Sequence, residues 1–234
     1  MKSQATLPRT LQALLIAGAC IFALARAQAA DPVQVTANNY VRAESDFQMR
    51  GYIENFDSFG KFHHSRKPYD VNNQVTVRGN RDTLYSFGVF DLTSPLTITL
   101  PDTKGRYQSL MVVNQDHSLA AAYSPNTITL TQDKVGTRYA LLTIRTFMDP
   151  KDESDIQAAH RLQDAVKVEQ ADIGKFEVPN WKKEEVEQMR ATINVVAATV
   201  TDSSKLFGRK EDLDPVYWML GTALGWGGLP AEAA

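Results

Sequence analysis

Cysteine is almost absent from this chain of 234 residues, and its absence excludes thiol chemistry from most of the sequence. The one cysteine, Cys20, lies in an apolar segment near the N-terminus. If that segment is removed, the remaining chain has no thiol that could form a disulfide, attack a substrate or bind a metal. The protein must then be stable without cross-links, which its length permits because a chain of this size buries a substantial core.

A hydrophobic run long enough to span a membrane is missing as well. The N-terminal apolar segment, Leu11–Leu24, has about 14 residues, whereas a membrane-spanning helix needs ~20. It follows two basic residues and precedes Ala27-Gln28-Ala29, which is the order of a secretory signal and its cleavage site. We therefore predict that residues 1–29 are a signal peptide, that the mature chain is periplasmic or secreted, and that it has no membrane span. A retained anchor, or a lipid on Cys20, is the alternative.

An excess of positive charge is also absent. The 25 basic residues include three in the signal segment, which leaves 22 against 27 acidic residues and a net charge of about −5. Nucleic-acid binding needs clustered lysine and arginine to replace counterions, so we predict no nucleic-acid partner. Only four histidines are present, and the adjacent His63 and His64 would diverge on a strand. Zinc needs three or four converging ligands, so we predict no metal and no other cofactor.

The spacing of apolar residues predicts a helix followed by strands. Residues 39–52 place apolar side chains three and four positions apart, as an amphipathic helix does. Residues 96–100 and 127–131 alternate apolar side chains with threonine, which is typical of half-buried antiparallel strands. In total the pattern predicts about six strands between Gln74 and Phe147.

After Pro150 the spacing becomes helical again. Apolar stripes over 156–166 and 186–200 predict two helices, which we expect to pack on each other because each stripe needs a partner. Asn180 is the expected N-cap of the second helix, and a last short helix should start at Pro215 and stop before Gly225.

Strands followed by helices indicate an α+β fold. We divide the chain into a signal peptide at 1–29, an N-terminal helix and loop at 30–70, a β-sandwich at 71–150, and a helical subdomain with a glycine-rich tail at 151–234.

Several segments resemble a known bacterial family. Asn80-Arg81-Asp82-Thr83-Leu84-Tyr85-Ser86, followed by Asp91-Leu92, is similar to the signature of an exported family, the domain of unknown function numbered twelve fifty-four. Further matches lie in order along nearly the whole mature chain: Val41-Arg42-Ala43-Glu44, Asp116-His117, Gly136-Thr137-Arg138-Tyr139, and Gly221-Thr222-Ala223 with Gly225-Trp226-Gly227-Gly228. The resemblance implies an antiparallel immunoglobulin-like β-sandwich followed by a small helical subdomain. It implies no particular activity.

The resemblance also suggests how the chain associates. Longer relatives continue into a second β domain, numbered twelve fourteen, and we expect this chain to lack it. We therefore expect either a homo-oligomer or binding to a separately encoded C-terminal partner domain. The alternatives are that the C-terminal segment folds back and buries itself, or that the chain is a degenerate fragment without activity. The surface would be formed by partly exposed apolar side chains: Tyr217, Trp218, Met219, Leu224, Trp226 and Leu229.

The first candidate site is Arg78–Tyr85. As a functional site, Arg81 would bind an oxyanion, Asp82 would orient it, and Tyr85 would donate a hydrogen bond. As a structural element, Gly79-Asn80 would form a hairpin turn with a local salt bridge. Turn chemistry favours the structural interpretation, although both can hold because binding sites often lie on loops at sheet ends.

The second candidate is Asp116-His117. A histidine can act as a base near neutral pH, but Asp116 would point away from His117 in an extended chain. A dyad would need a distant carboxylate such as Asp82 or Asp91. No Gly-x-Ser-x-Gly elbow supports a hydrolase serine.

Two functions follow from these candidates. The first is a binding or assembly module for a small polar ligand or a partner protein, with Asn80, Arg106 and Asp116 as ligand contacts. The second is a periplasmic hydrolase or lyase that uses His117 as base with Arg81 and Tyr85. Contact between His117 and Asp82 or Asp91 in one pocket would favour the enzyme.

Overall fold

The computed structural model describes residues 31–68 and 80–227. The described residues from Pro32 onward belong to one compact unit. The predicted signal peptide, Arg78, Gly79 and Leu229 lie outside the described residues. Within the described ranges, no helix combines the length and the apolar character needed to cross a membrane.

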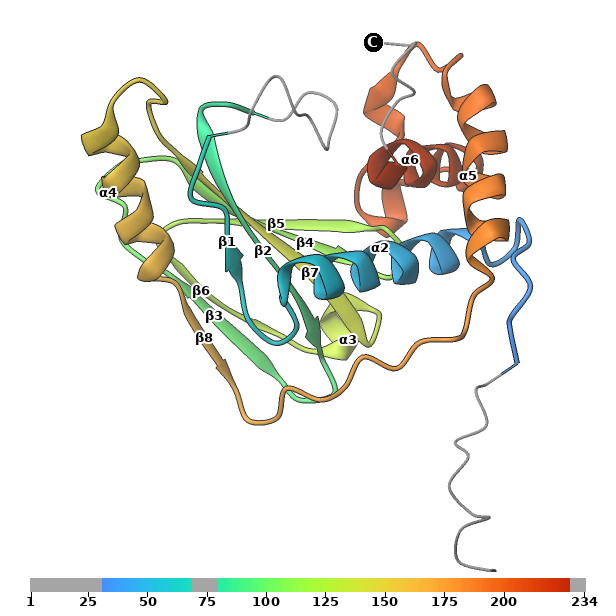
Figure 1. The fold of residues 1–234 in the computed structure, drawn as a ribbon, viewed down its shortest axis with the longest axis horizontal. Coiled ribbons are helices and arrows are strands. Elements are labelled where there is room, and N and C mark those ends of the chain that lie inside the picture. The colour runs from blue at the N-terminus through green and yellow to red at the C-terminus, as the bar shows by residue number, and fades with distance from the viewer. Residues whose placement is uncertain (1–30, 69–79, 228–234) are drawn as a thin grey trace, which may run out of the picture. The chain divides into compact units, whose positions relative to one another are not determined.

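Two antiparallel sheets form the centre of this unit (Figure 1). The larger has the strand order β1-β2-β7-β4-β5 and the smaller has the order β6-β3-β8. Six of the strands lie between Thr83 and Phe147, as the sequence predicts. The strands are β1 (His63–His64), β2 (Thr83–Asp91), β3 (Leu96–Leu100), β4 (Gln108–Asn114), β5 (Leu119–Tyr123), β6 (Asn126–Leu130), β7 (Tyr139–Phe147) and β8 (Lys167–Gln170).

The two sheets contribute to one hydrophobic cluster. Phe90, Leu110 and Leu142 come from the larger sheet, and Leu96 and Ile98 come from the smaller one. On the smaller sheet, threonines occupy the alternate positions, and their hydroxyl groups pair across β3 and β6 at 3.0 and 3.1 Å. The half-buried pattern predicted from the alternation is therefore confirmed. The immunoglobulin-like arrangement itself stays a prediction.

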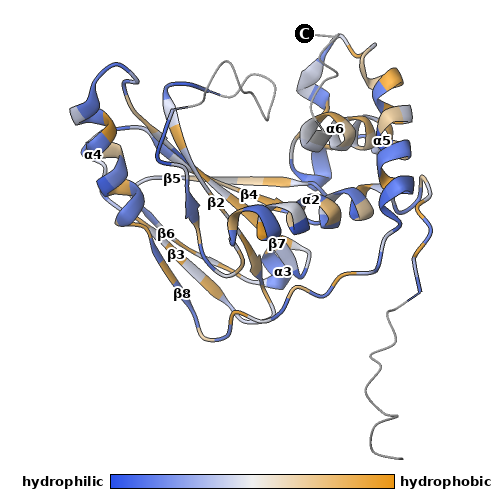
Figure 2. Ribbon diagram, in the orientation of Figure 1, coloured by the Kyte–Doolittle hydropathy of each residue, from blue (hydrophilic) through white to orange (hydrophobic). Residues whose placement is uncertain are grey.

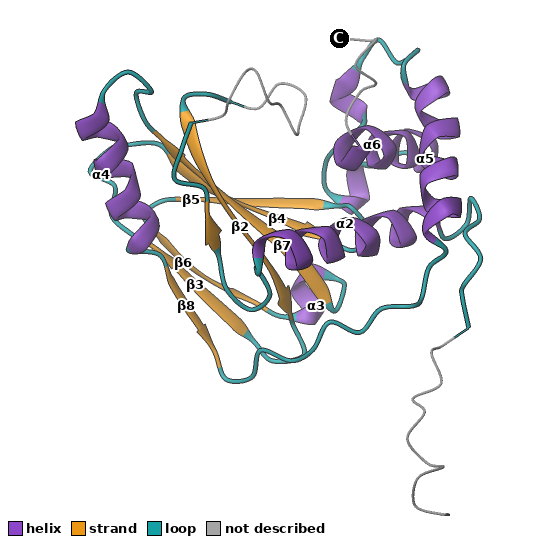
Figure 3. Ribbon diagram, in the orientation of Figure 1, coloured by secondary structure: helices purple, strands orange, loops and turns teal. Residues whose placement is uncertain are grey.

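α4 lies at one end of the larger sheet and α5 and α6 lie at the other, whereas α2 runs across the sheet and packs on it through Met49 (Figure 3). α6 begins at Pro215, as predicted, but it continues through Gly225 instead of stopping before it. α5 follows Lys182 as N-cap and not Asn180. The helices are α2 (Tyr40–Phe56), α3 (Gln132–Val135), α4 (Glu153–Asp164), α5 (Lys183–Ala197) and α6 (Pro215–Gly227), with short 3-10 turns η1 (Ser203–Lys205) and η2 (Lys210–Asp212).

The expectation that α4 and α5 pack on each other is wrong. Ile156 and Ala159 of α4 pack on Leu84 and Met148 at one end of the sheet. α5 lies at the other end, where it packs with α2 and α6 (Figure 1). β8 follows α4 and joins the smaller sheet, so an extended chain separates the two helices. Each apolar stripe is buried, but by a different partner from the one that sequence proximity suggested.

α6 approaches its neighbours closely because two glycines face them. A Cβ atom at Gly221 would overlap the carbonyl oxygen of Leu206, and one at Gly225 would lie 2.9 Å from the His117 ring. Most apolar side chains of α6, including Tyr217, Trp218 and Trp226, are therefore half-buried. Figure 2 shows the hydrophobic character of this helix and of β4 and β7, in contrast to the hydrophilic α4.

Candidate binding site

The two sites predicted from sequence lie at opposite ends of the larger sheet. Along the β2–β7 pairing, Thr83 is opposite Phe147 and Asp91 is opposite Tyr139. β4 runs alongside with Asn114 opposite Ala140, so the turn after β4 lies at the Asp91 end. A strand of this length spans ~26 Å at ~3.3 Å per residue. The Arg81 region and His117 therefore cannot share a reacting substrate, which removes the geometry that the enzyme hypothesis needs.

The segment that carries Arg81 and Asp82 leads into β2 and is exposed. The Asn80 amide donates to the Tyr85 hydroxyl oxygen at 3.3 Å, and the Met148 amide donates to the Asp82 carbonyl at 2.8 Å. These contacts belong to a strand entry and do not gather polar side chains around a cavity.

Arg106, a third predicted ligand contact, is already paired in the structure. It donates to the Asp155 carboxylate at 2.9 Å and to the Phe147 carbonyl at 2.8 Å. Hydrogen bonding to Asp155 raises the pKa of Arg106, so the guanidinium stays charged. Its role in the described structure is to hold the start of α4 against β7.

His117 is buried and packed against aromatic side chains. Its Nδ1 lies 3.1 Å from the Thr222 hydroxyl, and its ring contacts Phe207 and Trp226. Burial lowers its pKa to about 4, so the imidazole is neutral at pH 7. The backbone of His117 has a φ of 54°, which is uncommon for residues other than glycine and serves a tight turn.

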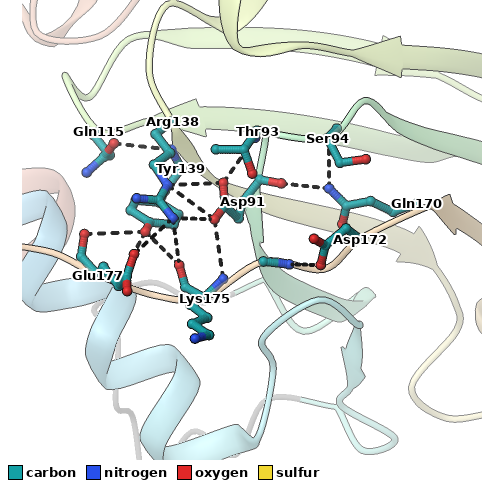
Figure 4. Close-up of polar contacts among 11 residues, drawn as sticks. Asp91, Thr93, Ser94, Gln115, Arg138, Tyr139, Gln170, Asp172, Lys175 and Glu177 are labelled. Carbon is teal, nitrogen blue, oxygen red and sulfur yellow. Dashed lines mark hydrogen bonds and ion pairs between the residues drawn. The ribbon is translucent and has the colours of Figure 1, made fainter.

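Asp91, the carboxylate considered as a partner for His117, binds Arg138 instead (Figure 4). The Arg138 guanidinium donates to Asp91 at 2.8 and 3.2 Å, and the Thr93 amide donates at 3.0 Å. Burial raises the pKa of Asp91, but these hydrogen bonds outweigh it and leave the pKa below its ordinary value. Arg138 also contacts Lys175 and Glu177, so the pair fastens the segment before α5 to the sheet.

The turn between β4 and β5, residues 114–118, connects the sheet to three helices. The Asn114 carboxamide accepts from the backbone amides of residues 116 and 118 and donates to the Val135 carbonyl of α3. Gln115 is buried, where it donates to Asp46 of α2 at 2.5 Å and accepts from the Tyr139 amide at 3.1 Å. His117 completes the set through α6. We call residues 114–118 the hub turn.

Asp116 of the hub turn pairs with Arg42 of α2. On the same helix, Glu44 is fully buried and accepts two hydrogen bonds from Arg190 of α5 at 2.8 and 2.9 Å. Asp46 accepts from the Trp181 indole at 2.9 Å. Burial is the main cause that raises the pKa of both Glu44 and Asp46. Sequence periodicity missed these two residues because it assigns acidic side chains to the exposed face of a helix.

A pocket of about 580 Å³ lies beside the hub turn, between the edges of the two sheets. Its apolar wall belongs to the core shared by the sheets, and its rim carries charged side chains from α3 and η2. The volume is in the range of small-molecule sites. The pocket is lined by Val112, Asn114, Asp116, Ser118, Leu119, Ala120, Ile128, Thr129, Leu130, Lys134, Val135, Gly136, Arg209, Lys210 and Glu211.

The pairing of β4 with β5 explains why Ala120 faces this pocket. Val112 is opposite Ala120, and residues 120 and 122 share a face because side chains alternate along a strand. Ala122 is buried in the core, whereas Ala120 is exposed at the pocket. Of the predicted ligand contacts, only Asp116 lines the pocket. Lys134, Arg209 and Lys210 were missed, and no sequence pattern beyond a charged run at 209–212 marks them.

The described residues contain no group of three or more histidine, cysteine or acidic side chains that could hold a metal ion. His63 and His64 diverge, as expected for neighbours on a strand: His63 stacks on Phe87, and His64 bonds to the Ser86 hydroxyl at 2.7 Å.

Comparisons with known proteins show a fold but no activity. No curated protein matches the sequence. The VPA0106 protein from Vibrio parahaemolyticus has a similar crystal structure, with a TM-score of 0.56 and 15% identity, over 82% of this chain and 66% of that one. A putative uncharacterized protein from Burkholderia cenocepacia matches at 13% identity over 84% of this chain and 49% of that one, with a TM-score of 0.35 that supports no fold assignment. This chain thus spans about two thirds and about half of their lengths. Residues 59–129 match the family model described as "Protein of unknown function (DUF1254)", which supports the resemblance found in the sequence.

Proposed function

We propose that this protein is a binding module that takes a small ligand into the pocket beside the hub turn. The observation that carries the proposal is the pocket itself: an apolar wall continuous with the core, a charged rim, and a volume of about 580 Å³. Ligand sites commonly combine such a wall with a few polar groups that fix the orientation of the ligand.

The hub turn supports binding over catalysis. Its polar side chains are committed to neighbours: Gln115 to Asp46 and Tyr139, Asp116 to Arg42. A catalytic base has to reach the substrate proton, and the ring of His117 packs against α6 instead of lining the pocket. The turn is therefore suited to hold the pocket wall rigid, which preorganises a site for its ligand.

The test uses a tryptophan that fills the pocket. Ala120→Trp places a large side chain inside, whereas Tyr123→Trp changes an exposed residue of the same strand that does not line the pocket. A small-metabolite library is screened by thermal shift, because a ligand that binds only the folded state raises Tm by mass action. We expect compounds that raise Tm of wild type and Tyr123→Trp but not of Ala120→Trp. The absence of any such compound, or an equal shift in Ala120→Trp, would contradict the proposal.

The finer features expected from the sequence complete the proposal. The protein acts after export, in the periplasm or outside the cell, with its two sheets arranged as an immunoglobulin-like sandwich. N-terminal sequencing of the exported protein tests cleavage after residue 29; a start at Met1 or a lipid on Cys20 would contradict it. Association through the C-terminal third is tested by sedimentation of wild type and Trp218→Ser.

A further inference from the structure

We infer that the ligand of this pocket is a small amphiphilic anion, with its charged group at Lys134 and Lys210 and its apolar body against the wall. The inference rests on the proposed function, and it adds the chemical class of the ligand. It follows from the charges at the rim, the apolar side chains of the wall, and the partly covered edge of β5 beside the pocket.

The rim has a surplus of positive charge that the protein does not neutralise. The carboxylate of Asp116 is paired with Arg42, and Glu211 lies 3.6 Å from Arg209. Among the described residues, the Lys134 ammonium donates a hydrogen bond only to the Thr129 carbonyl, at 3.4 Å. Within the described residues, the Lys210 side chain has no hydrogen bond or ion pair. Two cations are thus available to an anion, and an anionic group makes stronger hydrogen bonds to ammonium groups than a neutral one does.

The wall suits an aliphatic or aromatic body. Val112 and Leu130 are buried core residues, while Ile128 and Val135 are half-buried and pack on the same core from the pocket side. A ligand that covers the half-buried Ile128 and Val135 removes their apolar surface from water, at roughly 25 cal/mol per Å². A purely polar ligand would leave this surface wet.

The strand edge next to the pocket favours a small molecule over an added peptide strand. A peptide that extended the larger sheet would need the free backbone groups of β5. β5 has only five residues, and the Leu119 amide already donates to the Gly208 carbonyl at 2.9 Å. The segment around η2 therefore covers the start of this edge and limits the space to a short ligand.

The test compares three ligands with one chain length and different head groups. Octanoate, octan-1-ol and octylamine are titrated into the mature chain by calorimetry at low salt. We expect octanoate to bind about tenfold more tightly than octanol, and octylamine more weakly than both. The advantage of octanoate should shrink in 0.5 M NaCl, because salt screens exposed charges.

The variants test whether the affinity for octanoate depends on the two lysines at the rim or only on the net charge of the protein. Lys134→Gln/Lys210→Gln should lower the affinity for octanoate to that for octanol and leave the affinity for octanol unchanged. The control Lys151→Gln/Lys167→Gln removes the same charge away from the pocket and should change neither affinity.

Equal affinities for octanoate and octylamine, or an equal loss of octanoate affinity in the control, would overturn the inference that the ligand is an anion. If octanol still binds in that case, and Ala120→Trp abolishes its binding, the pocket remains the proposed ligand site and only the inference about charge fails. If none of the three binds, the inference fails, and the metabolite screen alone decides the proposed function.

Discussion

The hub turn and the Arg81 segment look alike in the sequence, but they have opposite physical environments. Each is a short polar stretch next to an apolar strand, and each matches the same family resemblance. In the structure, Gln115 and His117 are buried and joined to α2, β7 and α6, whereas Asn80, Arg81 and Asp82 are exposed. The comparison teaches that a recognisable motif can mark the place where a fold is fastened as readily as the place where a ligand binds.

The other segments that carry the family resemblance behave like the hub turn, because their side chains hold parts of the fold together. In residues 41–44, Arg42 pairs with Asp116 and Glu44 pairs with Arg190. Residues 136–139 contain Arg138, which pairs with Asp91. Residues 221–223 contain Thr222, which contacts His117. The segments therefore converge on one end of the sheet. The candidate pocket lies at that end as well, so these segments lie near the proposed ligand site without providing most of the residues that line it.

The largest effect is expected from Gln115→Ala. The change leaves the buried Asp46 carboxylate without one donor and the Tyr139 amide without its acceptor. Buried groups that lose a partner cost ~1–3 kcal/mol each, so we expect a loss of about 3 kcal/mol or more in the free energy of unfolding. Urea denaturation measures it. Gln157→Ala on exposed α4 is the matched control and should change stability by less than ~0.5 kcal/mol. Equal losses of stability in Gln115→Ala and Gln157→Ala would show that the hub turn contributes no more to stability than an exposed surface position.

Gly221→Ala should have the next largest effect. Its Cβ atom would overlap the Leu206 carbonyl, and because that atom is backbone, the helix must move. Overpacking of this kind costs ~1–3 kcal/mol. Gly51→Ala in α2 is the opposite case, since the nearest heavy atom is Asn55 Nδ2 at 4.0 Å. There alanine should raise the free energy of unfolding by up to ~1 kcal/mol. A stabilising Gly221→Ala would show that α6 does not dock as the structure places it.

His117 should make the folded state sensitive to acid. Burial lowers its folded pKa to about 4, while the unfolded chain takes up a proton near the ordinary value of 6.5. This contribution to stability is complete above pH 6.5 and is lost as the pH falls toward 4, with about 2 kcal/mol gone by pH 5.

His117→Asn tests the pH dependence and keeps a residue that tolerates the positive φ of the turn. The variant should be less stable than wild type at pH 8, with a difference that narrows toward pH 5. Glu44 and Asp46 have raised pKa values and act in the opposite direction in both proteins, so only the difference is informative. A constant difference across this range would show that His117 is not buried as a neutral group.

The smallest effect is expected at the Arg81 segment. Arg81→Ala and Asp82→Ala remove exposed side chains and leave the Asp82 carbonyl bond to Met148 in place. We expect changes below ~0.5 kcal/mol in stability and no change in the affinity of any ligand found in the screen. A large loss of ligand affinity in these variants would show that the ligand binds at the Arg81 segment and not beside the hub turn.

Periodicity and turn chemistry predict the elements of this fold well because they are local properties. β3 has the predicted bounds, and α6 starts at Pro215 as predicted. The partner of each helix is distant in the sequence: α4 packs on Leu84 of β2, and α5 packs on α2. The buried acids of α2 and the pocket were missed for the same reason. Each depends on groups that the fold brings together, such as Arg190 and Glu44, which are hydrogen-bonded, or Lys134 and Lys210, which line the same pocket.

The most direct test of the account compares both ends of the sheet in one experiment. A compound that passes the metabolite screen, or octanoate, is titrated into the isotope-labelled mature chain, and backbone amide shifts are followed by NMR. The account predicts that the shifts change in residues 112–120, 128–136 and 209–211, and that residues 80–86 stay unchanged. Changes that centre on residues 80–86, with residues 112–136 unaffected, would contradict it.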